Sequence, residues 1–265
     1  MKTIAICNLK GGVGKTVTTA NVGHILATSY GKNVLLIDGD SQGNLSQYFS
    51  VTPEEGSTTV DLLEIGTNCY PDFVTGTKIP GIDIIPADMT LMDADVDAIK
   101  DGRCKLQSIA DLRDAIEEDN ALEHSYDYIL IDCPPAFSAA STAALMAADE
   151  VIIPIRLDAF STEGMTQLTA QIRNMHRINE RTTLGGLLVT QYTRTPEEQD
   201  SLAWLRDQSG LPVYERIIRY SKRVSASTFA RQPLAEFSPG SAAARDYKRF
   251  VDELIAAESR GERNG

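Results

Sequence analysis

Short runs of Ile, Val and Leu recur along this chain with helix-like segments between them, and this alternation constrains the fold more than any other feature. The runs are continuously apolar, which is typical of strands that are covered on both faces of a sheet. Strands that alternate with helices form βαβ units, in which the strands run parallel. The sequence therefore predicts an α/β fold with a doubly wound, mostly parallel sheet flanked by helices.

These patterns also place the expected elements. The strand-like ranges are 3–7, 34–38, 82–85, 128–132, 151–155, 184–190 and 213–218. The helical ranges are 20–30, 165–178, 196–208 and 241–257. We expect a single domain over residues 1–265, because no linker rich in Pro, Gly or Ser and no internal repeat divides the chain. Residues 259–265 are expected to form a frayed tail.

Composition and patterning exclude several classes of protein. The apolar runs are far shorter than the roughly 20 residues that span a bilayer. No apolar signal segment follows the N-terminus, so we expect a cytoplasmic protein without a membrane partner. The four cysteines lie at wide and irregular spacings, and we expect reduced thiols. Six aspartates between residues 83 and 101 lack the central Gly and closing Glu of a calcium loop, so we expect a solvated helix face there.

Charge is distributed unevenly along the chain. The net charge of −12 argues against a nucleic-acid partner, because phosphate binding needs positive potential. Residues 211–249, however, hold eight basic and three acidic side chains, which is a local charge of +5. Within this segment Arg219, Lys222 and Arg223 recur at helix-like spacing. They are candidates for contacts with DNA phosphates, and solvated surface cations are the alternative.

A glycine-rich loop follows the first expected strand and precedes a helix. It reads Asn-Leu-Lys-Gly-Gly-Val-Gly-Lys-Thr over residues 8–16. Glycines let consecutive backbone N–H groups turn toward an anion, and the helix N-terminus adds a partial positive charge. Lys15 is placed to reach the β- and γ-phosphates, and the Thr16 hydroxyl to hold Mg²⁺. Leu9 occupies the place of the first Gly in the strict phosphate-loop pattern, and Lys10 adds a second lysine at the entrance.

Carboxylates end two of the other expected strands. Asp38 and Asp40 follow the apolar run 34–37, and Asp132 ends the run 128–131. In an open parallel sheet the carboxyl ends of the strands line the same edge as the phosphate loop. Each aspartate alone could be a turn residue or a helix cap, but together with the loop they indicate a site for Mg²⁺ and a reacting water.

This combination resembles the ParA/MinD/Soj family of P-loop ATPases with a deviant Walker A motif, most of all its ParA/Soj partition branch. The resemblance covers nearly the whole chain. It rests on the loop Lys-Gly-Gly-Val-Gly-Lys-Thr at 10–16, on Asp-x-Asp-x-Gln-Gly at 38–43, on Asp-Cys-Pro-Pro at 132–135, on Ile-Ile-Arg-Tyr-Ser at 217–221 and on the ending 232–247. It implies slow hydrolysis of ATP with Mg²⁺, a homodimer that forms with ATP, non-specific DNA binding, nucleoid association and stimulation by a ParB-type centromere-binding protein.

The resemblance also implies roles for individual residues. Lys10, Lys15 and Asp40 would be catalytic, with Lys10 reaching the partner's ATP and Asp40 positioning the attacking water. Thr16 would hold Mg²⁺ within the protomer, and Asp38 and Asp132 would hold it through its water shell. The nucleotide would contact Lys10, Gly11, Gly12, Val13, Gly14, Lys15, Thr16, Val17, Ile218 and Tyr220. DNA would bind in the region 216–231, through Arg219, Lys222 and Arg223.

Some positions depart from the family pattern, and two alternative functions stay open. Leu9 stands where Gln is usual, Val17 where a second Thr is usual, and Ser41 where Pro is usual. The segment 225–227 lacks the usual Glu-Ala. The first alternative is a MinD-like membrane-associated regulator of cell division, although acidic residues flank the last apolar positions of the chain. The second is a reductase resembling the nitrogenase iron protein, which needs paired cysteine thiolates from each subunit.

Overall fold

The computed structural model describes residues 1–54, 56–65, 71–100, 104–118, 126–157, 170, 172–174, 176–177 and 179–261. Its strands are β1 (Lys2–Ile6), β2 (Val34–Asp38), β3 (Thr75–Gly76), β4 (Ile82–Ile85), β5 (Tyr128–Asp132), β6 (Glu150–Ile155) and β7 (Thr183–Val189). They form one sheet in the order β3-β4-β2-β5-β1-β6-β7. All pairs are parallel except β3 with β4. The doubly wound, mostly parallel α/β sheet is confirmed.

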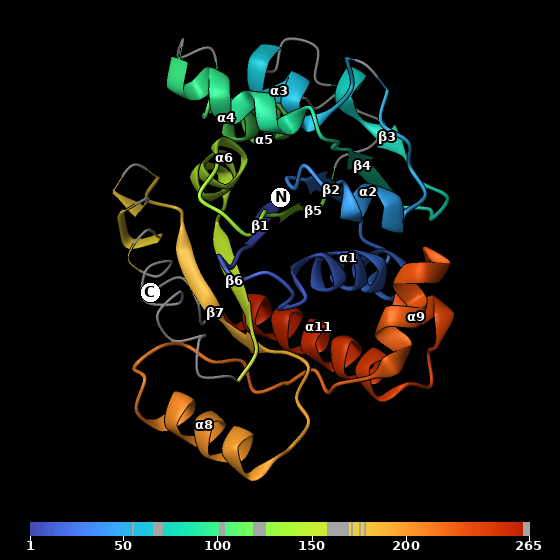
Figure 1. Ribbon diagram of the computed structural model, residues 1–265, viewed down its shortest axis with the longest axis vertical. Helices are drawn as coiled ribbons and strands as arrows, with labels where there is room; N and C mark the ends of the chain where they lie inside the picture. Colours follow the sequence, from blue (N-terminus) through green and yellow to red (C-terminus); the bar gives the residue numbers. More distant parts are fainter. Residues whose placement is uncertain are drawn as a thin grey trace.

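Helices cover both faces of the sheet (Figure 1). The longer ones are α1 (Lys15–Tyr30), α4 (Leu91–Lys100), α5 (Ser108–Glu118), α6 (Ala139–Ala147), α8 (Pro196–Asp207), α9 (Lys222–Ala230) and α11 (Ala242–Arg260). The short ones are α2 (Asn44–Tyr48), α3 (Thr59–Ile65) and α10 (Leu234–Phe237). α3, α4, α5 and α6 bury their apolar residues on one face, and α1, α2, α10 and α11 do so on the other.

Each central strand supplies both cores, because its side chains alternate between the two faces. In β2, Leu35 and Ile37 belong to the cluster under α3–α6, whereas Val34 and Leu36 belong to the cluster under α1 and α11. All four side chains are fully buried. This double burial explains why the strand sequences are continuously apolar.

The segment expected as a seventh long strand, 213–218, is not a regular strand, and this prediction was wrong. Tyr214 N donates to Leu187 O (3.1 Å) and Ile218 N to Val189 O (2.8 Å), so β7 advances two residues while this segment advances four. The excess residues leave the ladder, and the backbone N–H groups of Glu215 and Arg216 donate instead to the Glu253 carboxylate of α11, each at 2.9 Å. The segment therefore contacts β7 at two separated points.

Other boundaries differ in smaller ways. α1 begins at Lys15 instead of residue 20, because the helix starts directly at the glycine-rich loop. α11 continues to Arg260 and ends at Gly261, so the first two residues of the expected tail are helical. Residues 262–265 lie outside the described residues, as does most of the helix expected at 165–178. β3, which pairs with β4, was not expected.

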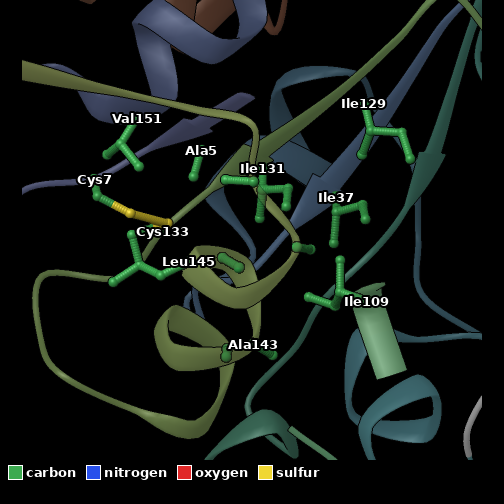
Figure 2. Packing of buried hydrophobic residues seen from close by; sticks show 14 of the residues in the cluster. Ala5, Cys7, Ile37, Ile109, Ile129, Ile131, Cys133, Ala143, Leu145 and Val151 are labelled. Carbon is green, nitrogen blue, oxygen red and sulfur yellow. A yellow bond between two sulfur atoms is a disulfide. The ribbon is translucent and has the colours of Figure 1, made fainter. Parts of the chain in front are cut away.

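Two of the cysteines form a disulfide instead of remaining reduced, which corrects the expectation for this pair. Ile6 and Asp132 are paired in the register of β1 and β5, so the next residues, Cys7 and Cys133, are neighbours with Cα atoms 5.1 Å apart. Figure 2 shows their sulfur atoms joined within the apolar cluster that includes Ala5, Ile131 and Leu145. Their separation of 126 residues in the sequence hides this contact.

Three further observations concern the acidic segment and the helices within the described ranges. On α4, Leu91 and Ala94 are buried, whereas Met92 and Asp93 are exposed, as a solvated helix face requires. No group of three or more His, Cys, Asp or Glu side chains among the described residues is arranged to hold a metal ion. No helix in the same ranges is long and apolar enough to cross a membrane.

Candidate functional site

The glycine-rich loop lies where the sequence places it, between the end of β1 and the start of α1. Gly12 has φ 72° and Gly14, the residue before the helix, has φ 89°. These left-handed conformations strain any residue with a Cβ atom, so glycine is required at both turns. The loop ends in a helix N-terminus, whose unpaired N–H groups and partial positive charge suit an anion such as phosphate.

The two lysines of the loop have different surroundings. Lys15 is only 7% exposed, and its Nζ donates to the backbone oxygen of Lys10 at 3.1 Å. Burial lowers the pKa of the Lys15 ammonium, while the carboxylates of Asp132 and Asp40 act in the opposite direction. Lys10 is half-buried, and its backbone N–H donates to Asn8 Oδ1 at 2.9 Å. Lys15 therefore lies inside the loop, and Lys10 lies at its entrance.

Asp38 is fully buried and organises the chain that follows β2. Its Oδ2 accepts hydrogen bonds from the backbone N–H (2.8 Å) and the hydroxyl (2.7 Å) of Ser46, and its Oδ1 accepts one from Asp40 N at 3.2 Å. Burial raises the pKa of Asp38 to about 6, and the bonds from Ser46 oppose this rise. Both oxygens of Asp38 are thus already bonded to protein groups.

Asp132 has a different position, although it pairs with Asp38 in the register of β2 and β5. It is fully buried and accepts a hydrogen bond from the Thr16 hydroxyl, and Thr19 Oγ1 lies 3.4 Å from its Oδ1. Its Oδ2 is buried without a hydrogen-bond partner. Burial, and then the nearby Asp38 carboxylate, raise the pKa of Asp132 well above its ordinary range.

An orphaned buried oxygen beside a hydroxyl is the donor set that Mg²⁺ prefers, since this ion takes oxygen ligands and keeps several of its waters. Asp132 and Thr16 therefore fit a magnesium ion at the loop. Asp38, whose oxygens are both occupied, fits only a contact through the water shell of such an ion.

The loop opens into a cavity of about 640 Å³. Its lining includes several of the expected site residues, namely Gly11, Gly12, Gly14, Lys15, Thr16, Val17, Asp40, Ile218 and Tyr220. Of the residues expected to hold the nucleotide and Mg²⁺, Lys10, Val13, Asp38 and Asp132 do not line it. The structure therefore brings the phosphate loop, Asp40 and the segment at Ile218 and Tyr220 to one cavity. Ile218 is 3% exposed, whereas Tyr220 is 54% exposed.

Several lining residues were missed by the sequence analysis. They are Gln42, Asn44, Gln47, Tyr48, Pro135, Thr190, Gln191, Ser221, Val224, Ser225, Thr228, Arg231 and Tyr247. A signal existed for Thr190 and Gln191, because they follow β7 at the carboxyl edge of the sheet, where ligands bind in open α/β folds. Thr228 and Arg231 had no such signal, since only the tertiary packing of α9 brings them to the cavity.

The basic candidates for DNA contacts fall into two groups. Arg219 is bonded to Asp246 by two short hydrogen bonds, Nε to Oδ2 and Nη2 to Oδ1, both at 2.7 Å. Lys222 and Arg223 are exposed in the first turn of α9. Across the described ranges, no carboxylate lies within ion-pair distance of either. Arg219 is therefore part of the attachment of residues 219–220 to α11, whereas Lys222 and Arg223 face solvent.

Comparisons with known proteins agree with this geometry. A family model described as an AAA domain matches residues 1–184. The chromosome partitioning protein ParA of Caulobacter vibrioides is 34% identical over 260 residues, which are 97% of this chain and 95% of that protein. The sporulation initiation inhibitor protein Soj of Bacillus subtilis is 31% identical over 257 residues, 96% of this chain and 98% of that protein.

A solved structure extends the likeness to three dimensions. Cobyrinic acid a,c-diamide synthase from Mycobacterium smegmatis, with bound ADP and magnesium, is 28% identical with a TM-score of 0.79 over 99% of this chain and 97% of that one. The family model covers well over half of the chain, and the curated relatives match nearly its whole length. The chain therefore belongs to the ParA/Soj family of chromosome-partitioning P-loop ATPases.

Proposed function

We propose that this protein is a DNA-partition ATPase that is switched by ATP. It binds ATP with Mg²⁺, dimerises in that state, binds DNA without sequence preference and hydrolyses ATP slowly until a ParB-type partner stimulates it. The observation that carries the proposal is the loop itself. A buried Lys15 and the orphaned Oδ2 of Asp132 lie at the start of α1, in a chain that is 34% identical to a ParA protein.

Within one protomer, the phosphates would lie on the loop. The N–H groups of residues 11–16 would donate to phosphate oxygens, and Lys15 would exchange its bond to Lys10 O for one to a phosphate. Mg²⁺, held by Thr16 and by Asp132, would neutralise charge on the β- and γ-phosphates. Asp40, which lines the cavity and is half-buried, would orient the attacking water and accept its hydrogen bond. Ile218 and Tyr220 would contact the base.

Lys10 supports the dimer part of the proposal. In the proposed site, Lys15 and the backbone of the loop would already cover the phosphate positions of their own protomer. Lys10 does not line the cavity of its own protomer. Its side chain is therefore suited to the phosphates of a second copy, held face to face across the nucleotides.

The DNA part rests on the local charge of +5 in residues 211–249 and on the exposure of Lys222 and Arg223. Arg219 would have a supporting role, because two of its guanidinium nitrogens are bonded to Asp246. Nothing in the described part of the chain offers a recognition helix for the major groove, so contacts to phosphates suffice and base readout is negligible. Such a dimer would associate with the nucleoid in the cytoplasm.

A MinD-like regulator of cell division is the alternative, and it would need a basic amphipathic helix at the end of the chain. α11 carries Asp252, Glu253 and Glu258 beside its last apolar positions, and anionic lipid would repel them. An iron-cluster reductase would need thiolates from Cys133, which is bonded to Cys7.

The test of the proposed function is retention on DNA with and without nucleotide. Purified protein is passed over an immobilised duplex of arbitrary sequence with ATP and Mg²⁺, with ADP, or with no nucleotide, and the same states are mixed with anionic vesicles. We expect retention on DNA only with ATP and Mg²⁺, and no binding to vesicles. Binding to vesicles without retention on DNA at low salt would overturn the partition function in favour of the membrane alternative.

A further inference from the structure

The end of β7 is bonded to the phosphate loop from the side. Thr190, the residue after the strand, is 3% exposed, and its Oγ1 lies 2.7 Å from Val13 O. Gln191 donates from Nε2 to Gly12 O at 2.6 Å. Thr190 and Gln191 thus bind two consecutive carbonyl groups of the loop, although they lie 177 and 179 positions further along the sequence than Val13 and Gly12.

These carbonyls matter because a phosphate loop works through its N–H groups. When a backbone N–H faces an anion, the neighbouring carbonyl oxygens must point elsewhere, since a carbonyl aimed at phosphate would repel it. Donors that bind the outward carbonyls of Gly12 and Val13 favour this orientation before nucleotide arrives. Such preorganisation lowers the entropy that binding must remove.

Gln191 has an unusual backbone that serves this contact. Its φ is 55°, in the left-handed region that side-chain-bearing residues rarely adopt. Thr190 is also within 3.0 Å of Ile155 O, so its hydroxyl, which has one proton to donate, lies between β6 and the loop. A strained residue next to a buried hydroxyl, both aimed at the same loop, points to a functional constraint.

The same strand end also holds the other side of the cavity. Tyr192 N donates to Ile218 O at 3.0 Å, and Tyr220 N donates to Tyr192 O at 2.9 Å. Three consecutive residues, 190–192, therefore connect the phosphate loop with the segment that carries Ile218 and Tyr220.

We propose that Thr190 and Gln191 are positioning residues that hold the phosphate loop in its nucleotide-binding conformation. The proposal rests on the nucleotide site described under the proposed function, and it adds two residues that act on the loop instead of on the reacting atoms. Because the loop contacts phosphates that ATP and ADP share, both nucleotides depend on this support.

The main variant is Thr190→Val, which keeps the shape of the side chain and removes the hydroxyl. The chain offers a matched control in Thr182, which is 1% exposed at the other end of β7. Its Oγ1 lies 3.0 Å from both Leu145 O and Ala148 O. Thr182→Val therefore also removes a buried threonine hydroxyl that lies between two backbone carbonyls, but far from the loop. Thr190→Ser, a second control, keeps the hydroxyl and removes only the methyl group.

Dissociation constants for ATP and ADP are measured by calorimetry, KM and kcat by phosphate release, and amide exchange of residues 11–16 by mass spectrometry. For Thr190→Val we expect both dissociation constants and KM to rise about three- to tenfold, as the loss of one buried hydrogen bond implies, with kcat nearly unchanged. Loop amides should exchange faster. Thr190→Ser and Thr182→Val should keep wild-type affinity, with Thr182→Val losing thermal stability only.

Gln191→Met gives a second measurement that does not depend on a buried hydroxyl, because Gln191 is half-buried and Met has similar length without an N–H donor. We expect a smaller loss of affinity in the same direction. Wild-type affinity and loop exchange in both Thr190→Val and Gln191→Met would overturn the positioning role, provided that Lys15→Ala abolishes binding. If Lys15→Ala also binds normally, the nucleotide site itself is wrong, and the positioning role falls with it.

Discussion

Two lysines lie five positions apart in the phosphate loop, and their burial separates their roles. Lys15 is 7% exposed and bonded within the loop, whereas Lys10 is half-buried at the entrance. We expect Lys10→Ala to bind ATP with a modest loss of affinity but to remain monomeric, because in the proposed dimer this side chain would contact the partner's phosphates. Light scattering with ATP or a slowly hydrolysed analogue measures this, with Lys15→Ala as the variant that binds no nucleotide. Dimers of Lys10→Ala would leave the role across the interface unsupported.

Asp40 differs from the two deeper aspartates because it lines the cavity. Its Oδ1 accepts a hydrogen bond from Gln42 N at 3.0 Å, which orients the carboxylate at the cavity wall. Asp40→Ala should bind ATP normally, since the loop would supply the phosphate contacts of the proposed site, but its turnover should fall about a hundredfold or more, as the loss of a positioned base implies. Phosphate release at saturating ATP is the measurement. If Asp40→Ala hydrolyses ATP at the wild-type rate, a group other than Asp40 orients the attacking water.

Arg219 is expected to contribute more to the stability of the fold than to DNA binding. Its guanidinium is bonded twice to the Asp246 carboxylate, which is 6% exposed. Arg219→Ala would leave this buried carboxylate without its main partner, at a cost of about 1–3 kcal/mol, and partial exposure of Arg219 favours the lower end. Urea unfolding checks this against Lys222→Ala, which should unfold like the wild type. Equal midpoints for the two variants would contradict the structural role of the pair.

At the scale of single residues, the sequence predicts those parts of the site that depend on local order. Lys15 and Thr16 could be located because they follow a strand and its loop, and Asp132 because it ends a strand, and such positions meet at one edge of a parallel sheet. The bond between Arg219 and Asp246 and the disulfide between Cys7 and Cys133 could not be located, since they join residues that only tertiary packing brings together.

At the scale of elements, α9 is the part of the basic segment that suits DNA. Lys222 and Arg223 occupy its first turn, and both are exposed. We expect Lys222→Glu with Arg223→Glu to abolish retention on DNA while ATP-driven dimerisation continues. A control of equal charge change is Lys78→Glu with Arg173→Glu, two exposed cations outside residues 211–249, which should still be retained. If the α9 double variant is still retained on DNA at moderate salt, DNA binds at another surface of the protein.

The strands of the sheet show which elements the hydrophobic pattern of the sequence predicts and which it does not. Strands buried on both faces, such as β2 and β5, were predicted with their observed bounds, because a short, continuous apolar run is typical of a strand that is covered on both faces. The range 213–218 is apolar at both ends, but Glu215 and Arg216 interrupt it, and it lies at the edge of the sheet, where Glu253 of α11 binds the N–H groups of these two residues. Apolar composition indicates burial, and it does not reveal which backbone partner the segment takes.

At the scale of the whole molecule, charge is divided between two regions. Residues 54–118, which include α3, α4 and α5, hold 15 acidic and 5 basic side chains, whereas residues 211–249 hold eight basic and three acidic ones. Figure 1 shows α3, α4 and α5 grouped at one end and α9 and α11 on the other side of the sheet. A polyanion should therefore be repelled from the first region and attracted to the second, so DNA is expected to approach the side of the molecule that carries α9.

This division makes the salt dependence of DNA binding a test of the whole assembly. Each cation that neutralises a phosphate releases counterions, so the logarithm of affinity falls with the logarithm of salt concentration by about 0.9 per phosphate contact. A dimer offers twice the contacts of a monomer. We expect the slope for wild type with ATP to be about twice that of Lys10→Ala with ATP, and affinity to be equal for two unrelated duplexes of the same length, because phosphates carry no sequence information. Fluorescence anisotropy over a series of salt concentrations measures both quantities. A preference for one duplex would indicate base readout, and equal slopes for wild type and Lys10→Ala would show that ATP-driven dimerisation does not create the DNA-binding surface.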